Sequence, residues 1–169
     1  MTVSIRLAND DDVKVISDIC RVTFEASIGQ LSRSKNPLSN FTLKTESSEI
    51  YKRMRTGGGV FDIPSLFFLA QLETNSVGVL ELSDGHIIDL IFVVPQYQRK
   101  GIGTKLFEEM RVYEREKVKA AKFIAAHSPV CSVEFFQSLG FLFEGHGHAD
   151  FLDSDFGEKI YMRYHHEDR

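Results

Sequence analysis

The stretch that decides the fold is VVPQYQRKGIGT, residues 93–104. It follows an apolar run, passes through a polar loop and opens a helix at Gly101 and Gly103. The first turn of a helix leaves backbone N–H groups unpaired and carries a partial positive charge. Two glycines there let an oxyanion approach the backbone without meeting a Cβ atom. Because Arg99 and Lys100 add positive charge, the stretch predicts an anion site that suits a diphosphate.

Other phosphate-binding motifs fit this stretch less well. A dinucleotide-binding turn needs G-x-G-x-x-G, and Leu106 stands where the third glycine belongs. A P-loop needs four residues between its glycines and then Gly-Lys-Ser/Thr, which this sequence lacks. An isolated G-x-G also occurs in ordinary strand-to-helix turns, and that interpretation stays open on the glycines alone. The Thr104 hydroxyl would add one more donor to an anion site.

The sequence on either side of this stretch predicts a mixed α/β sheet with helices on both faces. Apolar alternation and turn residues predict strands at 3–7, 66–72, 77–82, 86–94, 122–127, 141–145 and 160–165. Helical periodicity predicts helices at 13–24, 46–55, 101–119 and 128–139. The three strands within 66–94 are expected to form an antiparallel meander, with the last of them central. We therefore expect one α/β domain over residues 1–169, with six to seven strands and about four helices.

Composition excludes several classes of protein. The chain has 169 residues and a net charge of −4, which argues against a general nucleic-acid binder. No apolar run follows a basic head, and none is long enough to span a membrane, so we expect a cytoplasmic protein. The two cysteines, Cys20 and Cys131, are far apart and favour reduced thiols. Residues 98–122 hold eight basic and four acidic side chains, so a basic block lies inside an acidic chain.

The full spacing V-x-P-x-x-Q-x-x-G-x-G resembles the acetyl-CoA signature of the GNAT superfamily of N-acetyltransferases. Its Q-x-x-G-x-G core matches Gln98, Gly101 and Gly103. A second stretch, FFQSLGF at 135–141, is similar to the family's second marker, and the expected order of elements agrees as well. The resemblance implies the GNAT fold, acetyl-CoA as co-substrate, no metal, and direct attack of a primary amine on the acetyl group.

The resemblance also implies which residues hold the cofactor. The main chain of Phe92 and Val93 would pair with the pantetheine arm like an added strand, beside a neighbouring strand that splays away. An N–H near Val93 would polarise the thioester carbonyl. Phe136 would pack against the cofactor. The pyrophosphate would be held, largely by backbone N–H groups, by Gln98, Arg99, Lys100, Gly101, Ile102, Gly103 and Thr104.

Two residues are candidates for the catalytic proton transfers. Asp89 interrupts an apolar strand, and in the family an acidic residue on this strand often faces the acceptor, so it is the first candidate for general base. His86 and Glu81 are weaker candidates. Ser132, near the start of the last helix, could reach the sulfur, although a packing role is the alternative interpretation.

Two positions depart from the family pattern. The family commonly has tyrosine where this chain has Phe136, which has no proton to give. Pro129 stands where an asparagine is often found. A CoA-binding module with little transferase activity, acting as a sensor or subunit, is therefore the alternative function.

The acceptor is the least determined part of the prediction. The loops at 27–45 and 146–158 are expected to line its entrance, and the acids at 150, 153, 155 and 158 would favour a cationic amine. His146, His148 and Asp150 could instead hold a metal, although a solvated loop is the preferred interpretation. A homodimer is left open.

Overall fold

The computed structural model describes residues 2–27, 44–59, 61–119, 122–146 and 159–166. Within these ranges the strands are β1 (Val3–Leu7), β2 (Leu66–Leu72), β3 (Asn75–Ser83), β4 (Ile87–Val93), β5 (Phe123–Pro129), β6 (Leu142–His146) and β7 (Lys159–His165). The α-helices described are α1 (Val13–Ser27), α3 (Ser47–Thr56), α4 (Ile102–Tyr113) and α5 (Val133–Ser138). The predicted fold class, a mixed α/β sheet flanked by helices, is confirmed.

The seven described strands form one sheet in the order β1-β2-β3-β4-β5-β7-β6. Strands β2, β3 and β4 make the predicted antiparallel meander. The parallel pairing of β4 with β5 joins this half to a second antiparallel group of β5, β7 and β6. Strand β4 is therefore central, at the junction of the two halves.

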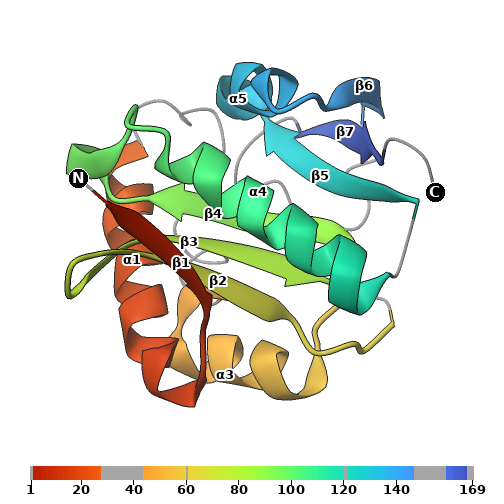
Figure 1. Ribbon diagram of the computed structural model, residues 1–169. Coiled ribbons are helices and arrows are strands. Elements are labelled where there is room, and N and C mark those ends of the chain that lie inside the picture. Colours follow the sequence, from red (N-terminus) through yellow and green to blue (C-terminus); the bar gives the residue numbers. More distant parts are fainter. Residues whose placement is uncertain (1, 28–43, 60, 120–121, 147–158, 167–169) are drawn as a thin grey trace, which may run out of the picture.

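Helices cover both faces of the sheet (Figure 1). Alternation along the strands sends Phe67, Leu69 and Val79 to one face, where they pack with the apolar stripes of α1 and α3. Phe68 and Leu80 point to the opposite face and pack with α4 and α5. The two cores meet across β4, so that strand is held from both sides.

Two predicted helices differ from the observed elements. The helix expected at 128–139 is shorter, because β5 continues to Pro129 through its pairing with β7 and α5 begins only at Val133. The helix expected at 101–119 ends as a regular α-helix at Tyr113 and continues as a π-helix over Glu114–Val118. In that wider turn the Glu114 carboxylate is fully buried, with its Oε2 3.0 Å from His166 Nε2.

Candidate functional site

The candidate site begins where β4 and β5 part. Their parallel ladder consists of two pairs, Ile87 with Ala125 and Ile88 with Ala126. Beyond Ile88, β4 stays paired with β3 as far as Val93, whereas β5 stays paired with β7 as far as Pro129. Each strand thus follows its own half of the sheet, and the edge of β4 that faces β5 is left open.

A cavity of about 370 Å³ occupies this parting. One wall comes from β3 and β4, with Glu81, Ile88, Asp89, Leu90, Ile91 and Phe92. The second comes from β5 and the start of α5, with His127, Pro129, Ser132 and Phe136. The third comes from α3 and the residues next to it, with Lys44, Thr45, Glu49, Lys52, Arg53, Gly57 and Gly58. A more open depression of about 560 Å³ lies between residues 7–11 and 65–67 and contains none of the predicted site residues.

Strand alternation determines which main-chain groups reach the open edge of β4. The N–H of Val94 donates to Val77 O at 2.9 Å, so in an antiparallel ladder the polar groups of Phe92 also point towards β3. Those of Ile91 and Val93 then point to the open edge, where an extended ligand could pair with them. Of the two residues expected to pair with a ligand, Val93 directs its main chain to this edge, whereas Phe92 directs its own towards β3 and lines the cavity. Ile91 is the other residue whose main chain faces the open edge.

Asp89 lies at a bulge in β4. Glu81 pairs with Leu90, and Leu82 pairs with Ile88, so Asp89 is an extra residue with no partner on β3. A bulge of this kind redirects a side chain out of the regular alternation. The exposed carboxylate of Asp89 lines the cavity at the point where β4 and β5 begin to part.

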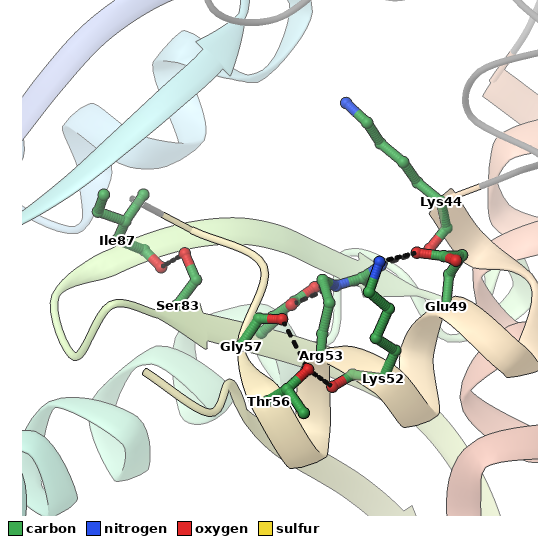
Figure 2. Close-up of polar contacts among 9 residues, drawn as sticks. Lys44, Glu49, Lys52, Arg53, Thr56, Gly57, Ser83 and Ile87 are labelled. Atoms are coloured by element: carbon green, nitrogen blue, oxygen red, sulfur yellow. Dashed lines mark hydrogen bonds and ion pairs between the residues drawn. The ribbon is translucent and has the colours of Figure 1, made fainter. Parts of the chain in front are cut away.

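Beneath Asp89 lies a buried ion pair between α3 and β3. Arg53 Nε donates to Glu81 Oε1 at 2.7 Å, and Arg53 Nη2 donates to Glu81 Oε2 at 3.0 Å. Burial raises the pKa of the Glu81 carboxyl, Arg53 partly lowers it, and the nearby Asp89 charge adds to the rise. A third donor of Arg53 bonds the main-chain oxygen of Lys44 at 2.7 Å (Figure 2). Glu81 is thereby engaged by Arg53, which leaves Asp89 as the better placed carboxylate for proton transfer.

The opposite wall of the cavity carries the second predicted catalytic residue. Ser132 is half-buried at the N-cap of α5, and its side chain makes no capping hydrogen bond. Phe136, which is 4% exposed, lies one turn further and packs edge-on against Phe141 at 5.1 Å. His127 also lines this wall, with its ring 5.2 Å from that of Tyr161. The structure therefore brings Asp89, Ser132 and Phe136 to one cavity.

The turn between β4 and α4 has the geometry of an anion site. Arg99 and Gly101 both have positive φ, at 58° and 76°, and the space around a Cβ on Gly101 is open to 4 Å. Lys105 is the first residue of α4 to donate back, to Gly101 O at 3.0 Å. The N–H groups of residues 102–104 precede that bond, so the helix itself does not use them. Gln98 braces the turn by donating to Val93 O at 2.9 Å.

Gly103 is needed for a reason other than the expected one. A Cβ at this position would lie 3.1 Å from Phe135 Cζ, so the glycine lets α4 pack closely against α5. The space beside its Cα is filled by an aromatic ring and is closed to an oxyanion. Of the two glycines, Gly101 is the one with open space, while Gly103 offers only its N–H.

The remaining predicted residues of this turn divide into two groups. Arg99, Lys100 and Thr104 are exposed, and the Lys100 ammonium lies 5.4 Å from the centre of the Tyr97 ring. The Ile102 side chain is 2% exposed and belongs to the core, so only its main chain can serve a ligand. Lys105, the next cation along the chain, donates to the Val3 carbonyl.

Several other candidates lie outside the cavity. His86 bonds the Asp84 carbonyl at 2.9 Å and stacks edge-on against Phe123, which makes it a turn residue. Cys20 and Cys131 are both free thiols, and burial raises the pKa of Cys20 to about 12. Within the described ranges no cluster of three metal-ligating side chains occurs, and no helix is both long and apolar enough to cross a membrane. His148, Asp150 and the other acids of the 147–158 loop lie outside the described residues, as do residues 28–43.

The arrangement can hold an extended molecule that carries a diphosphate. The open edge of β4 supplies main-chain partners, and the turn at Gly101 supplies N–H donors at its end. Asp89 can accept a proton inside the cavity, and Ser132 can donate one. Sequence analysis missed Ile91 and Arg53 as parts of this site, and it included Lys44 only within the 27–45 loop that was expected at the acceptor entrance. Strand alternation could have indicated Ile91, whereas the other two are placed by tertiary contacts.

Comparison with known proteins supports this description. The sequence model described as the acetyltransferase (GNAT) domain matches residues 32–148. No curated protein sequence gave a significant match.

Solved structures with the same fold cover almost the whole chain. A GCN5-related N-acetyltransferase from Rhodopseudomonas palustris has a TM-score of 0.78 at 18% identity, over 98% of this chain and 97% of that one. The PaiA N-acetyltransferase from Thermoplasma acidophilum, in complex with coenzyme A, has a TM-score of 0.77 at 16% identity, over 98% and 100%. A spermidine N-acetyltransferase that is a chimera of the Vibrio cholerae SpeG protein and hSSAT has a TM-score of 0.67 at 16% identity, over 98% and 96%. At these identities the likeness shows the fold.

Proposed function

The chain belongs to the GNAT acetyltransferase family, and from this premise we propose that it transfers the acetyl group of acetyl-CoA to a primary amine. The observation that carries the proposal is the parting of β4 and β5 beside the Gly101 turn, with Asp89 on a bulge inside the cavity. The parting gives an extended thioester a place along β4, and the bulge gives the attacking amine a base.

We assign the cofactor contacts to the open edge of β4 and to the turn that follows it. Ile91 and Val93 would offer main-chain partners to the pantetheine arm. The N–H groups of residues 102–104 would bind the pyrophosphate, with Arg99 and Lys100 close by in sequence to add charge. Phe92 and Phe136 would cover the arm with their rings, since both line the cavity.

The proton transfers fall to the two catalytic candidates. An ammonium group has no free electron pair, so Asp89 would accept a proton from the acceptor, directly or through one water molecule. The amine nitrogen then bonds to the acetyl carbon, and the bond from that carbon to sulfur breaks. The nitrogen loses its second proton in this step, and that proton neutralises the leaving thiolate, directly or by passing through the Ser132 hydroxyl. Ser132 could donate a proton to the leaving thiolate from the opposite wall, and the N–H of Ile91 or Val93 would stabilise negative charge on the carbonyl oxygen.

One alternative follows from Phe136. This ring lies at the cavity without a hydroxyl, so the usual proton donor of the family is missing and the fold could bind CoA as a sensor or subunit. Ser132 carries a hydroxyl on the same wall as Phe136 and could take over, and a CoA thiolate is a fair leaving group without help. We therefore favour the enzyme.

Thiol release from acetyl-CoA tests the function. The purified chain is mixed with acetyl-CoA and a panel of primary amines, and free thiol is recorded over time. Amine-dependent release at rates well above the background identifies a transferase. Tight binding of acetyl-CoA without release for any amine would support the binding module instead.

We expect Gly101→Ala to weaken acetyl-CoA binding by about tenfold, because its methyl group would enter the open space where an oxyanion would approach. Gly140→Ala is the matched control, since Gly140 also has a positive φ, 92°, but lies after α5 away from the turn. Both variants should lose similar stability, of the order of 1 kcal/mol, from the left-handed backbone. Calorimetric titration with acetyl-CoA should separate them, and equal affinities for the two variants would remove Gly101 from the site.

A further inference from the structure

The described walls of the cavity carry both signs of charge in equal number. Three carboxylates line them, those of Glu49, Glu81 and Asp89. Three cations line them as well, those of Lys44, Lys52 and Arg53. A cavity built to attract a polycation would be expected to carry an excess of acids. What such a cavity attracts therefore depends on which of its charges are already paired.

Two opposite pairs account for four of these groups. Arg53 and Glu81 form a two-pronged ion pair whose carboxylate is 1% exposed, so their charges cancel inside the protein. Lys52 and Glu49 lie one helical turn apart on α3, with Nζ 4.0 Å from Oε2. The second pair is exposed and weak, but it still sets one charge against the other.

Lys44 and Asp89 remain, and the structure places them on different walls. Among the described residues neither makes an ion pair within 4.0 Å. Two hydrogen bonds anchor the main chain at Lys44. Arg53 donates to the Lys44 carbonyl at 2.7 Å, and the Ser17 hydroxyl donates to the Thr45 carbonyl at 2.6 Å. Figure 2 shows the Lys44 side chain extending away from Arg53 and Glu49. Lys44 is thus a cation on an anchored backbone, and it lines the same cavity as the Asp89 carboxylate.

From this arrangement we infer that the acceptor is a small zwitterionic amine, with its amino group at Asp89 and a carboxylate at Lys44. This inference rests on the proposed transferase function, in which Asp89 receives the reacting amine. A free amino acid has both groups at a short separation and suits a cavity of about 370 Å³ that it shares with the end of the pantetheine arm. A polyamine would bring a second ammonium towards Lys44, and like charges in a partly enclosed site oppose binding.

The test compares carboxylates with carboxamides. Thiol release from acetyl-CoA is measured with the common L-amino acids, with their carboxamides and with spermidine. We expect kcat/KM to favour the best amino acid over its own carboxamide by about tenfold, the size of one charge-assisted contact. In Lys44→Gln this preference should disappear. In Lys52→Gln, the matched control from the same wall, it should persist. Because each ratio is compared between variants, differences in amine basicity cancel.

The outcomes separate this inference from the proposed function. Release with spermidine or the carboxamides but not with amino acids would leave the transferase standing and overturn the zwitterionic acceptor. A preference for carboxylates that survives in Lys44→Gln would overturn the role of Lys44. Release with no amine in the panel, while acetyl-CoA still binds, would overturn the transferase function and this inference together.

Discussion

Replacing Asp89 by asparagine should lower kcat/KM for acetyl transfer by about 10²–10⁴-fold, the usual contribution of a general base. The amide has nearly the shape of the carboxylate and keeps a hydrogen-bonding group at the bulge, but it cannot accept a proton from an ammonium. The affinity for acetyl-CoA should stay within about twofold, because the cofactor is assigned to main-chain groups further along β4. Steady-state thiol release and calorimetric titration measure the two quantities.

The pH profile distinguishes loss of a base from a merely distorted site. In the mechanism proposed above Asp89 removes the proton, so activity of the unmodified chain should not require an amine that is already neutral in solution. In Asp89→Asn only acceptor molecules that are already unprotonated in solution can react. Activity should therefore keep rising with pH towards the pKa of the acceptor, about 10 for an alkyl amine. Glu49→Gln is the control, since Glu49 lines the same cavity and is paired with Lys52. A loss below threefold in Asp89→Asn, or an equal loss in Glu49→Gln, would refute Asp89 as the base.

The second large effect is on stability. Arg53→Ala should lower the free energy of unfolding by about 3–5 kcal/mol, because it leaves the Glu81 carboxylate buried without its partner. The double variant Arg53→Ala with Glu81→Leu should recover a large part of this loss, since no buried charge remains. Lys52→Ala breaks only an exposed pair on the same helix and should cost less than about 1 kcal/mol. Urea unfolding of the four proteins gives these values.

The loss in Arg53→Ala should also depend on pH in a defined direction. Burial raises the pKa of Glu81 above its ordinary value of 4.5, and removing Arg53 removes the group that partly lowers it. A carboxyl group whose pKa is higher in the folded chain than in the unfolded chain lowers the free energy of unfolding as the pH rises from the unfolded pKa to the folded pKa. The difference between wild type and Arg53→Ala should therefore be largest near neutral pH and shrink as pH falls towards 4.5. A difference that grows on acidification would show that Glu81 is not the group left unpaired.

The sequence predicted those parts of the fold that depend on local patterns. Helical spacing placed α1, α3 and α4, and alternation placed the strands within two residues of their observed ends. The stretch at 93–104 indicated an anion-binding turn because its glycines and cations are adjacent in the chain. The local pattern gave a wrong prediction at Ser128, which was expected to begin a helix. In the structure Ser128 lies in β5 and pairs with Ile160 of β7.

The features that non-local packing determines could not be predicted in this way. The bulge at Asp89 could not be predicted from the sequence, because the strand is apolar on both faces. It therefore has no alternation of polar and apolar residues in which a shift of one position would be detected. Arg53 and Glu81 are 28 positions apart, and only the packing of α3 on the sheet brings them together. Gly103 looks like part of the anion site in sequence, but Phe135 from α5 takes the space beside it. Each case depends on a neighbour that is distant along the chain.

The most direct test of this account is a crystal structure of the chain with coenzyme A. We expect the pantetheine arm to pair with the main chain of Ile91 and Val93, the pyrophosphate to lie on the N–H groups of residues 102–104, and the thiol to point into the cavity that holds Asp89 and Ser132. Coenzyme A bound away from the parting of β4 and β5, or with its thiol directed away from Asp89, would contradict the proposed site and the chemistry assigned to it.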